Sequence, residues 1–144
     1  MIEVRQIEHN GAEYYAMTHL RREVLRRPLG LDFTSEDLTV ESGHFLLAAF
    51  DGLEMVGCLV LTPYDAEHVK MRQVAVVPGR QGKGIGKQMV DFSERFAREK
   101  GFGHMILHAR DTAVPFYLAL GYEIIGEPFE EVTIPHRKMA KKLL

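Results

Sequence analysis

The amino-acid sequence predicts one mixed α/β domain, and three observations support this prediction. The chain has 144 residues, which is inside the size range of a single compact domain. Its composition, 46% hydrophobic and 26% charged, is that of a globular protein with a real core. Segments with the period of strands alternate with segments that have the period of helices. We therefore expect residues 1–144 to form a single domain.

Charge and cysteine content exclude several classes of protein. The net charge of -2 does not support a nucleic-acid scaffold, whose surface would be basic. The single cysteine, Cys58, excludes an internal disulfide and suits a reducing compartment. There is no apolar run of about 18 residues, and residues 1–5 lack a signal-peptide core. We expect a cytoplasmic protein that binds neither nucleic acid nor membrane.

The N-terminal part of the chain predicts a strand followed by a helix. Residues 2–7 alternate between apolar and polar side chains, as a strand does. Residues 12–27 carry apolar side chains at helical spacing, and Pro28 ends this helix. The arginines near its end are expected on a solvated face. The apolar stripe comprises Tyr15, Met17, Leu20, Val24 and Leu25, and the arginines are Arg21, Arg22, Arg26 and Arg27.

A buried hairpin is predicted next. The apolar runs 44–50 and 55–61 are joined at the turn signal Asp51-Gly52. Cys58 lies inside the second run without a nearby base, so we interpret it as a core residue rather than a nucleophile. Residues 31–40, between the helix and the hairpin, are polar and predict a short helix.

The following segment predicts a strand, a turn and a long helix. The predicted strand 71–77 carries β-branched residues, and Pro78 stops it because proline cannot extend a ladder. A helix runs from Ile85 to Lys100, and Gly101 stands where a left-handed cap would end it. Its expected core face comprises Ile85, Met89, Phe92, Phe96 and Ala97, and its polar faces carry Lys87, Asp91, Glu94, Arg95 and Arg98.

The C-terminal third predicts three more strands and a short helix. Residues 103–109 predict the fifth strand, 113–120 the helix, and 122–125 the sixth strand. Residues 129–139, interrupted by Pro135, predict a last, bent strand. The candidate helix caps are Asp111 and Thr112, and the expected basic tail contains Lys138, Lys141 and Lys142.

The turn before the long helix has the composition of an anion site. Residues 79–87 hold four glycines and three cations. The first turn of a helix presents unpaired N–H groups and partial positive charge, and glycines let a phosphate approach the backbone. A pyrophosphate site is therefore predicted, and a plain connecting turn is the alternative. The glycines are Gly79, Gly82, Gly84 and Gly86, and the cations are Arg80, Lys83 and Lys87.

The spacing of these residues selects among the known phosphate motifs. The nucleoside-triphosphate pattern fails, because it needs a glycine at Gln81 and a hydroxyl at Gln88, and the dinucleotide pattern Gly-x-Gly-x-x-Gly fails as well. The pattern that fits is Gln/Arg-x-x-Gly-x-Gly/Ala, with Gln81, Gly84 and Gly86 directly after the strand. In this segment the chain resembles the GNAT superfamily of acyl-CoA-dependent N-acetyltransferases.

A second segment carries the same resemblance. Residues 113–122 resemble the family signature Ala-x-x-Phe-Tyr-x-x-x-Gly-Phe/Tyr. The resemblance implies a central, mostly antiparallel sheet of about six to seven strands flanked by about four helices, and acetyl-CoA as cosubstrate. It also implies that the helix beginning near Ala113 flanks the pantetheine arm, and that strand 74–76 splays from the fifth strand and offers the arm its backbone groups. The implied cofactor-binding residues are Val74, Ala75, Val76, Arg80, Gln81, Gly82, Lys83, Gly84, Ile85, Gly86, Lys87 and Phe116.

The implied reaction is direct attack of a neutral amine on an acetyl thioester. An N–H group near Val76 can hold the carbonyl oxygen as negative charge develops. Tyr117 is the candidate acid for the leaving thiolate, since a phenol titrates near 10, close to an alkyl thiol. The alternative is that Tyr117 is a core aromatic residue with a satisfied hydroxyl.

The base that deprotonates the amine stays open at the level of sequence. Arg72 and Gln73 occupy the region where some GNATs have a glutamate. Lone histidines are more often packed or exposed than catalytic, and a water chain can also serve. The histidines form no metal-binding pattern, so no metal is expected. The candidates are His108, His136, Glu127, Glu130 and Glu131.

The C-terminal residues suggest a branch of the family but no acceptor. Ile134-Pro135-His136 resembles the Gly-Ile-Pro-His ending of small bacterial ElaA-like GNATs, with Thr133 in place of the glycine. The acceptor pocket is expected from residues 26–42 and 128–136, and the last strand can pair across a homodimer. Two other functions stay open: a GNAT-fold sensor that binds CoA without transfer, and a nucleotide-binding α/β domain.

Overall fold

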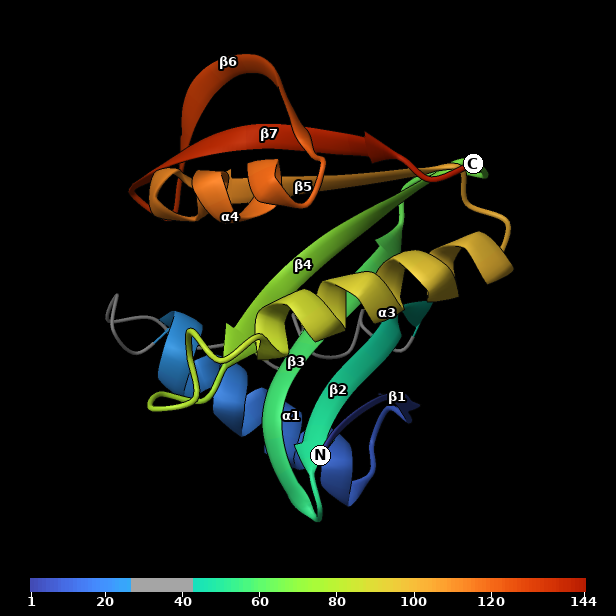
Figure 1. Cartoon of the computed structure of the whole chain (residues 1–144), viewed down its shortest axis with the longest axis vertical. Coiled ribbons are helices and arrows are strands. Elements are labelled where there is room, and N and C mark those ends of the chain that lie inside the picture. Colours follow the sequence, from blue (N-terminus) through green and yellow to red (C-terminus); the bar gives the residue numbers. More distant parts are fainter. Residues whose placement is uncertain (27–42) are drawn as a thin grey trace. The chain divides into compact units, whose positions relative to one another are not determined.

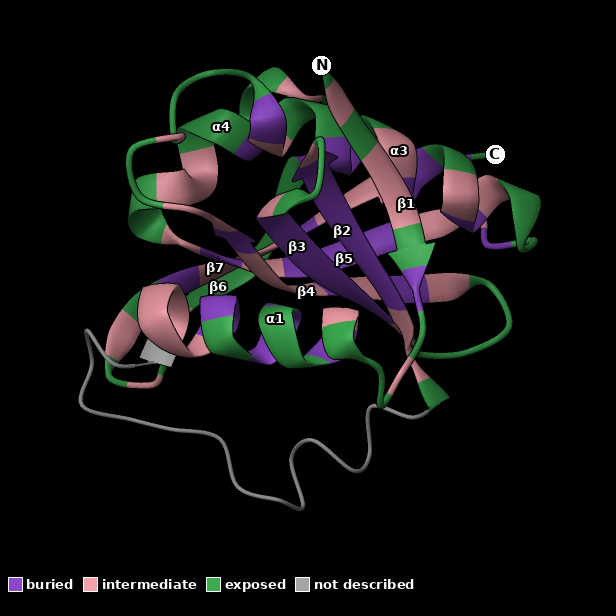
Figure 2. Ribbon diagram, turned by 90° about the horizontal axis from the view of Figure 1, so that it is seen from below, coloured by how far each residue is buried: buried purple, intermediate pink, exposed green. Residues whose placement is uncertain are grey.

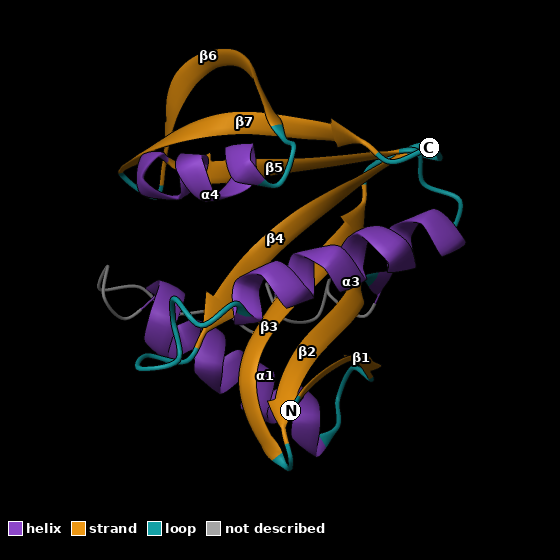
Figure 3. Ribbon diagram, viewed as in Figure 1, coloured by secondary structure: helices purple, strands orange, loops and turns teal. Residues whose placement is uncertain are grey.

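The computed structural model describes residues 1–26 and 43–144, and it confirms the mixed α/β fold. Figures 1 and 3 show the elements. The strands are β1 (Ile2–Ile7), β2 (Phe45–Asp51), β3 (Glu54–Pro63), β4 (His68–Val76), β5 (His104–Arg110), β6 (Glu123–Glu131) and β7 (Ile134–Lys142). The helices are α1 (Ala12–Arg21), α3 (Ile85–Glu99) and α4 (Val114–Ala119), with a π-helical segment Arg22–Arg26 and a 3₁₀ turn Asp111–Ala113.

Hydrogen bonds join the strands in the order β1-β2-β3-β4-β5-β7-β6. The pairs β1–β2, β2–β3, β5–β7 and β6–β7 are antiparallel, and β4–β5 is parallel. The described residues contain three α-helices where about four were predicted, and no helix among them is long and apolar enough to span a membrane. Three predictions fall on residues 27–42, which lie outside the described residues: the end of the first helix at Pro28, the short helix at 31–40, and most of the pocket segment 26–42.

The chain forms two compact units, and β3, β4 and α3 each continue from one unit into the other. Unit 1 comprises Met1–Thr62 and Gln73–Ser93, and unit 2 comprises Pro63–Arg72 and Glu94–Leu144. Strand β4 changes units at Gln73, which has a left-handed φ of 56°. The ladder between β4 and β5 runs from the pair His68–His104 to the pair Met71–Leu107 and so ends before this residue. A left-handed, non-glycine residue breaks the regular pleat, which explains why pairing stops there.

Helix α1 packs on one face of the strands in unit 1. Its buried side chains Tyr14, Met17 and Leu20 join a core cluster with alternate residues of β2 and β3. Figure 2 shows β2 and β3 as almost wholly buried strands. Residues on the opposite face of β3 meet α3, where Met89 packs against Gly57. Burial on both faces explains why both runs of the hairpin are apolar throughout.

The predicted apolar stripe of α1 was wrong in detail. Tyr15 is 80% exposed and does not face the core, whereas Met17 and Leu20 are buried as predicted. The other buried residues of α1 are Tyr14, Thr18 and Arg21, and the buried positions recur mostly at spacings of three and four residues. Arg21 has no exposed surface, so it does not lie on the solvated face that was predicted. The α-helix ends at residue 21, and the chain continues as the π-helical segment. Because a π-helix has a wider turn, the side chains after residue 21 no longer follow the α-helical spacing.

Gly57 lets β3 and α3 approach closely, and its replacement should destabilise the protein. A Cβ atom there would lie 2.9 Å from Met89 Sδ and 3.2 Å from the Ala75 carbonyl oxygen. We expect Gly57→Ala to lower the free energy of unfolding by about 1–3 kcal/mol, because overpacking strains a filled core. Chemical denaturation measures the change. Gly103→Ala is the control, since nothing lies within 4 Å of its Cβ position, and an equal loss in both variants would contradict this account.

Unit 2 corrects the predicted C-terminal elements. Residues 129–139 do not form one bent strand, because β6 continues to Glu131 and β7 starts at Ile134. The lysines expected in a tail, Lys138, Lys141 and Lys142, all belong to β7. Helix α4 has Ala113 as its N-cap and no side-chain cap, so neither predicted cap residue serves, because both lie in the preceding 3₁₀ turn. Pro115 lies in the first turn of α4, as predicted.

A strained turn joins β6 to β7. Glu131 pairs with Ile134, so Val132 and Thr133 form the two-residue turn, with φ values of 46° and 64°. Such turns favour glycine or asparagine, and β-branched residues are strained there. We expect Thr133→Gly to raise the free energy of unfolding by about 1 kcal/mol, measured by chemical denaturation. The control is Thr112→Gly, because Thr112 is exposed and its backbone is not left-handed, so this variant should lose stability. Loss of stability in both variants would contradict the proposed strain at Thr133.

Candidate functional site

The backbone of the glycine-rich turn is open to a ligand. Gly79, Gly82 and Gly84 have φ values of 89°, 78° and 84°, and a Cβ atom at any of them would find no atom within 4 Å. The first bond of α3 runs from Gln88 N to Gly84 O over 3.1 Å. The N–H groups of the first three helical residues therefore have no acceptor within the helix. This part of unit 1 can bind an anion through its backbone.

Arg80, one of the predicted anion-binding cations, is already paired. Its guanidinium lies 2.8 Å from Asp51 Oδ2 and 3.2 Å from Glu54 Oε2 in the β2–β3 turn. The hydrogen bond from Arg80 lowers the pKa of Asp51, and the bond to Asp51 raises the pKa of Arg80. Arg80 therefore attaches the turn to the hairpin, and its charge is largely balanced. Lys87 faces Asp91 at 3.5 Å, and Lys83 makes no ion pair within residues 1–26 and 43–144.

The predicted backbone groups of β4 lie beside this turn in unit 1. Ala75 is buried in the core cluster under α1, and Val74 and Val76 are half-buried. The side-chain amide of Gln81 donates to the Val76 carbonyl oxygen over 3.2 Å. Gln81 thus closes the end of β4 onto the glycine turn, which is a direct reason for a glutamine at this position.

Tyr117, the predicted acid, is held in α4 by aromatic neighbours. Its side chain is 7% exposed, and its ring makes edge contacts with Phe116 at 5.0 Å and Tyr122 at 5.6 Å. Burial raises the pKa of Tyr117 from 10.0 to about 12. Within the described part of the chain its hydroxyl makes no hydrogen bond. Tyr117 is thus packed like a core residue, while its hydroxyl lacks the partner that a purely structural tyrosine normally has.

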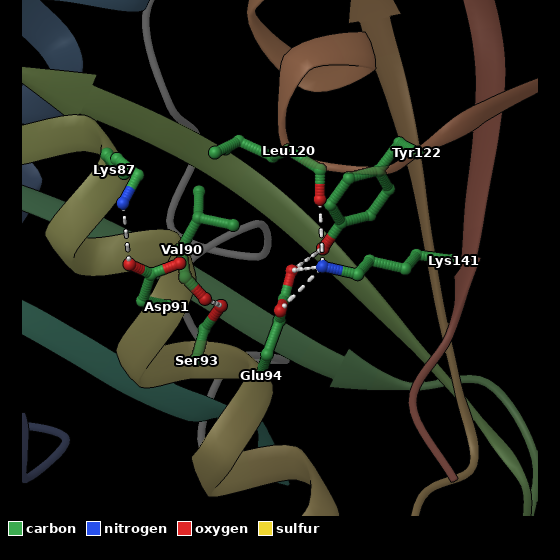
Figure 4. A network of polar contacts seen from close by, with 8 residues as sticks. All are labelled: Lys87, Val90, Asp91, Ser93, Glu94, Leu120, Tyr122 and Lys141. Atoms are coloured by element: carbon green, nitrogen blue, oxygen red, sulfur yellow. Dashed lines mark hydrogen bonds and ion pairs between the residues drawn. The ribbon is translucent and has the colours of Figure 1, made fainter.

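A buried carboxylate fixes the C-terminal end of α4 (Figure 4). Glu94 is 5% exposed, which corrects its predicted place on a polar face of α3. It accepts hydrogen bonds from the Tyr122 hydroxyl at 3.0 Å and from Lys141 Nζ at 3.0 and 3.2 Å. Lys141 also donates to the Leu120 carbonyl oxygen at 2.8 Å. This network links α3, α4 and β7 within unit 2 and stabilises the segment that carries Tyr117.

Two predicted histidines and one predicted glutamate come together in unit 2. His108 Nδ1 lies 2.9 Å from Glu131 Oε1, and His136 Nε2 lies 3.7 Å from Glu131 Oε2. Lys70 Nζ, which the sequence did not single out, lies 3.2 Å from His108 Nδ1. The other two predicted glutamates, Glu127 and Glu130, are exposed, and within the described part of the chain neither forms an ion pair with these residues. We call Lys70, His108, Glu131 and His136 the histidine cluster.

Charge and burial set the protonation of the histidine cluster. Burial alone would raise the pKa of Glu131, but the hydrogen bond from His108 and the charges of His108, His136 and Lys70 outweigh it, so its pKa is lowered. Burial lowers the pKa of Lys70, and Glu131 partly opposes this. His136 donates from Nδ1 to the Ile134 carbonyl oxygen at 2.7 Å, which leaves Nε2 toward Glu131. The cluster therefore combines an ionised carboxylate with two imidazole rings.

The comparisons with known proteins agree with this architecture. A family model described as an acetyltransferase (GNAT) domain matches residues 25–143. The chain belongs to this GNAT family. The N-acetyltransferase YjcF of Bacillus subtilis (strain 168), described as uncharacterized, is 29% identical over 126 residues, which are 85% of this chain and 88% of that protein.

Solved structures of GNAT proteins have the same fold. Escherichia coli ElaA has a TM-score of 0.79 at 23% identity, with 98% of this chain and 99% of that chain covered. A GNAT family acetyltransferase from Elizabethkingia anophelis, with acetyl-CoA bound, has a TM-score of 0.77 at 19% identity, with 98% and 97% covered. The predicted GNAT resemblance is thus confirmed at the level of family and fold.

The raised pKa of Tyr117 makes the stability of this GNAT domain depend on pH. The folded pKa of about 12 exceeds the ordinary value of 10.0, so the stabilisation is complete below pH 10 and is lost as the pH rises toward 12. The loss should reach about 2–3 kcal/mol. Urea unfolding at pH 9 and pH 11.5 measures this loss, and the free energy of unfolding of Tyr117→Phe should fall less over the same interval. Equal falls in the two proteins would exclude burial of this phenol as the cause.

Proposed function

We propose that this protein transfers the acetyl group of acetyl-CoA to a primary amine by direct attack in a ternary complex. The observation that carries the proposal is the open glycine turn, where left-handed glycines precede the free N–H groups of α3. Such a turn suits a diphosphate, which coenzyme A contains. Membership of the GNAT family supports acetyl transfer, and the relative from Elizabethkingia anophelis with acetyl-CoA bound supports the donor.

We assign the diphosphate to the backbone rather than to the cations of the turn. Arg80 is matched by two carboxylates, so Lys83 is the cation with the most freedom to approach a phosphate. The N–H groups of residues 82–87 would donate to phosphate oxygens, as helix N-termini commonly do. Val74 and Val76 would offer backbone groups to the pantetheine arm, and the N–H near Val76 would hold the acetyl oxygen.

Tyr117 is our candidate for the group that stabilises the leaving thiolate. With a pKa of about 12 its hydroxyl is fully protonated at neutral pH and can donate a hydrogen bond as the C–S bond breaks. The raised pKa also makes it a weaker acid than the thiol that leaves, so its contribution should be a hydrogen bond to the developing thiolate, which then takes its proton from solvent. Phe116, in edge contact with Tyr117, is 38% exposed and would flank the arm.

The histidine cluster is our candidate for the base. The acceptor ammonium must first lose a proton. Its nitrogen then attacks the acetyl carbon, and the C–S bond breaks. His108 is held by Glu131 and is 26% exposed, so its outer nitrogen can accept that proton directly or through water. His136 is 5% exposed and tied to the backbone, which favours a supporting role.

The test is release of free thiol from acetyl-CoA with pools of small amines, amino acids, aminosugars and peptides. The proposal expects release that depends on both enzyme and amine, and an N-acetylated product by mass spectrometry. Tight binding of acetyl-CoA with no thiol release for any amine would instead favour a CoA-binding sensor. Thermal stabilisation by ATP or NAD but not by acetyl-CoA would contradict the assignment of the donor.

A further inference from the structure

Two groups of opposite character compete for one ring nitrogen of His108. Lys70 Nζ lies 3.2 Å from His108 Nδ1, and Glu131 Oε1 lies 2.9 Å from the same atom. A lysine ammonium can only donate a hydrogen bond, and a carboxylate can only accept one. Nδ1 therefore satisfies Lys70 when it is bare and Glu131 when it carries a proton, but never both at once.

The position of this proton decides whether His108 can act as a base. A neutral imidazole carries one N–H. When that N–H is on Nδ1 and donates to Glu131, the lone pair is on Nε2, for which the described residues contain no partner. When the Lys70 ammonium donates to Nδ1, the proton is on Nε2 and the outer lone pair is gone. Only the first form can take a proton from an acceptor amine.

We propose that Glu131 and Lys70 are positioning residues that set the tautomer of His108, with Glu131 holding the basic form and protonated Lys70 favouring the other. This inference rests on the proposed acetyl transfer, in which His108 accepts the proton of the amine. Glu131 acts through His108 and does not itself contact the reacting atoms. Lys70 adds a dependence on pH, because loss of its proton ends the competition.

The charged groups around His108 come from each strand packed against it. Lys70 and Arg72 lie on β4, Glu131 on β6, and His136 and Lys138 on β7, where Lys138 pairs with His108. Burial lowers the pKa of Lys70, the charge of Glu131 raises it, and Arg72 and Lys138 lower it further. Lys70 thus loses its proton at lower pH than an exposed lysine, so activity should rise with pH over the interval in which Lys70 becomes neutral.

The direct test is the tautomer of His108 in the full chain, read by long-range ¹H–¹⁵N NMR of labelled histidine. At pH 8 we expect the Nδ1–H tautomer of His108 to predominate in the wild type, and we expect its population to be larger in Lys70→Met. Glu131→Ala should shift the ratio toward Nε2–H by about tenfold. The matched controls Lys142→Met and Glu123→Ala, on β7 and β6, should leave the ratio unchanged. An unchanged ratio in Lys70→Met and Glu131→Ala would overturn the inference.

Kinetics separate this inference from the proposed function. Glu131→Ala should lower kcat about tenfold or more with the KM for acetyl-CoA unchanged. Lys70→Met should flatten the rise of kcat over the pH interval in which Lys70 loses its proton in the wild type. If Lys70→Met kept the wild-type dependence of kcat on pH, the inference would be overturned, but the proposed acetyl transfer would not be affected. Tautomer shifts as expected, with no thiol release from any amine, would confirm the shared nitrogen and overturn acetyl transfer. Lys70→Met and Glu131→Ala should shift the tautomer ratio of His108 in opposite directions. If one variant misfolds, the other therefore still tests the inference.

Discussion

Gly84→Val should weaken acetyl-CoA binding by about 100-fold. The backbone at Gly84 has a φ of 84° and open space around its Cβ position. A valine there would fill the space through which a diphosphate approaches and would strain the entry into α3. A 100-fold loss corresponds to about 2.7 kcal/mol, or roughly one to two hydrogen bonds to a charged phosphate. Isothermal titration with acetyl-CoA measures this affinity.

Gly101→Val is the matched control for this prediction. Gly101 has a similar φ of 92° and equally open surroundings, but it follows the other end of α3. Both variants should lose stability, because valine is strained in the left-handed region. Only Gly84→Val should lose affinity for acetyl-CoA. If the two variants bound acetyl-CoA equally well, strain and not diphosphate contact would be the sole consequence of filling position 84.

Tyr117→Phe should lower kcat by tenfold or more and leave the dissociation constant of acetyl-CoA nearly intact. The ring would keep its edge contacts with Phe116 and Tyr122, and only the hydroxyl would be lost. That hydroxyl makes no hydrogen bond among the described residues, so its removal leaves no buried partner unsatisfied. The loss would then report stabilisation of the thiolate as it forms. Single-turnover kinetics with saturating acetyl-CoA measures the chemical step.

Tyr15→Phe provides the comparison for the loss of a hydroxyl, because Tyr15 is 80% exposed in α1. It should retain wild-type turnover. Unchanged turnover in Tyr117→Phe would remove Tyr117 from the mechanism and leave it as a core aromatic residue. A parallel loss of turnover and acetyl-CoA affinity would indicate that α4 had moved rather than that a hydrogen-bond donor to the thiolate was missing.

Regular elements were predictable because their side chains repeat with a simple period. Residues 2–7 alternate cleanly, and β1 has these same bounds. The stripe of α1 was misplaced because Tyr14 and Tyr15 are adjacent and chemically alike, so composition cannot decide which of them faces the core. The buried Arg21 and the π-helical segment after it have no periodic signal at all.

Backbone conformations that oppose the local residue preference were not predictable. Gln73, Val132 and Thr133 are left-handed, although β-branched residues in particular avoid this region. The hairpin at Val132–Thr133 was therefore read as part of one bent strand, and the bounds of β6 and β7 were wrong. Gly79, Gly82 and Gly84 show the opposite case, because glycine indicates such a conformation directly.

The candidate site was predictable only where its residues are neighbours in sequence. The glycine turn lies within one short segment, so its spacing could be compared with known motifs. The histidine cluster joins Lys70, His108, Glu131 and His136 through the pairing of separate strands, and single-sequence reasoning has no access to that pairing. For the same reason the pairing of Arg80 with the β2–β3 turn was not foreseen.

A crystal structure of the full chain with coenzyme A tests the central claim most directly. We predict that the diphosphate oxygens lie within hydrogen-bonding distance of N–H groups between Gly82 and Lys87, with Arg80 still paired to Asp51. Density for the diphosphate at any other place, with the glycine turn unoccupied at saturating coenzyme A, would contradict the account.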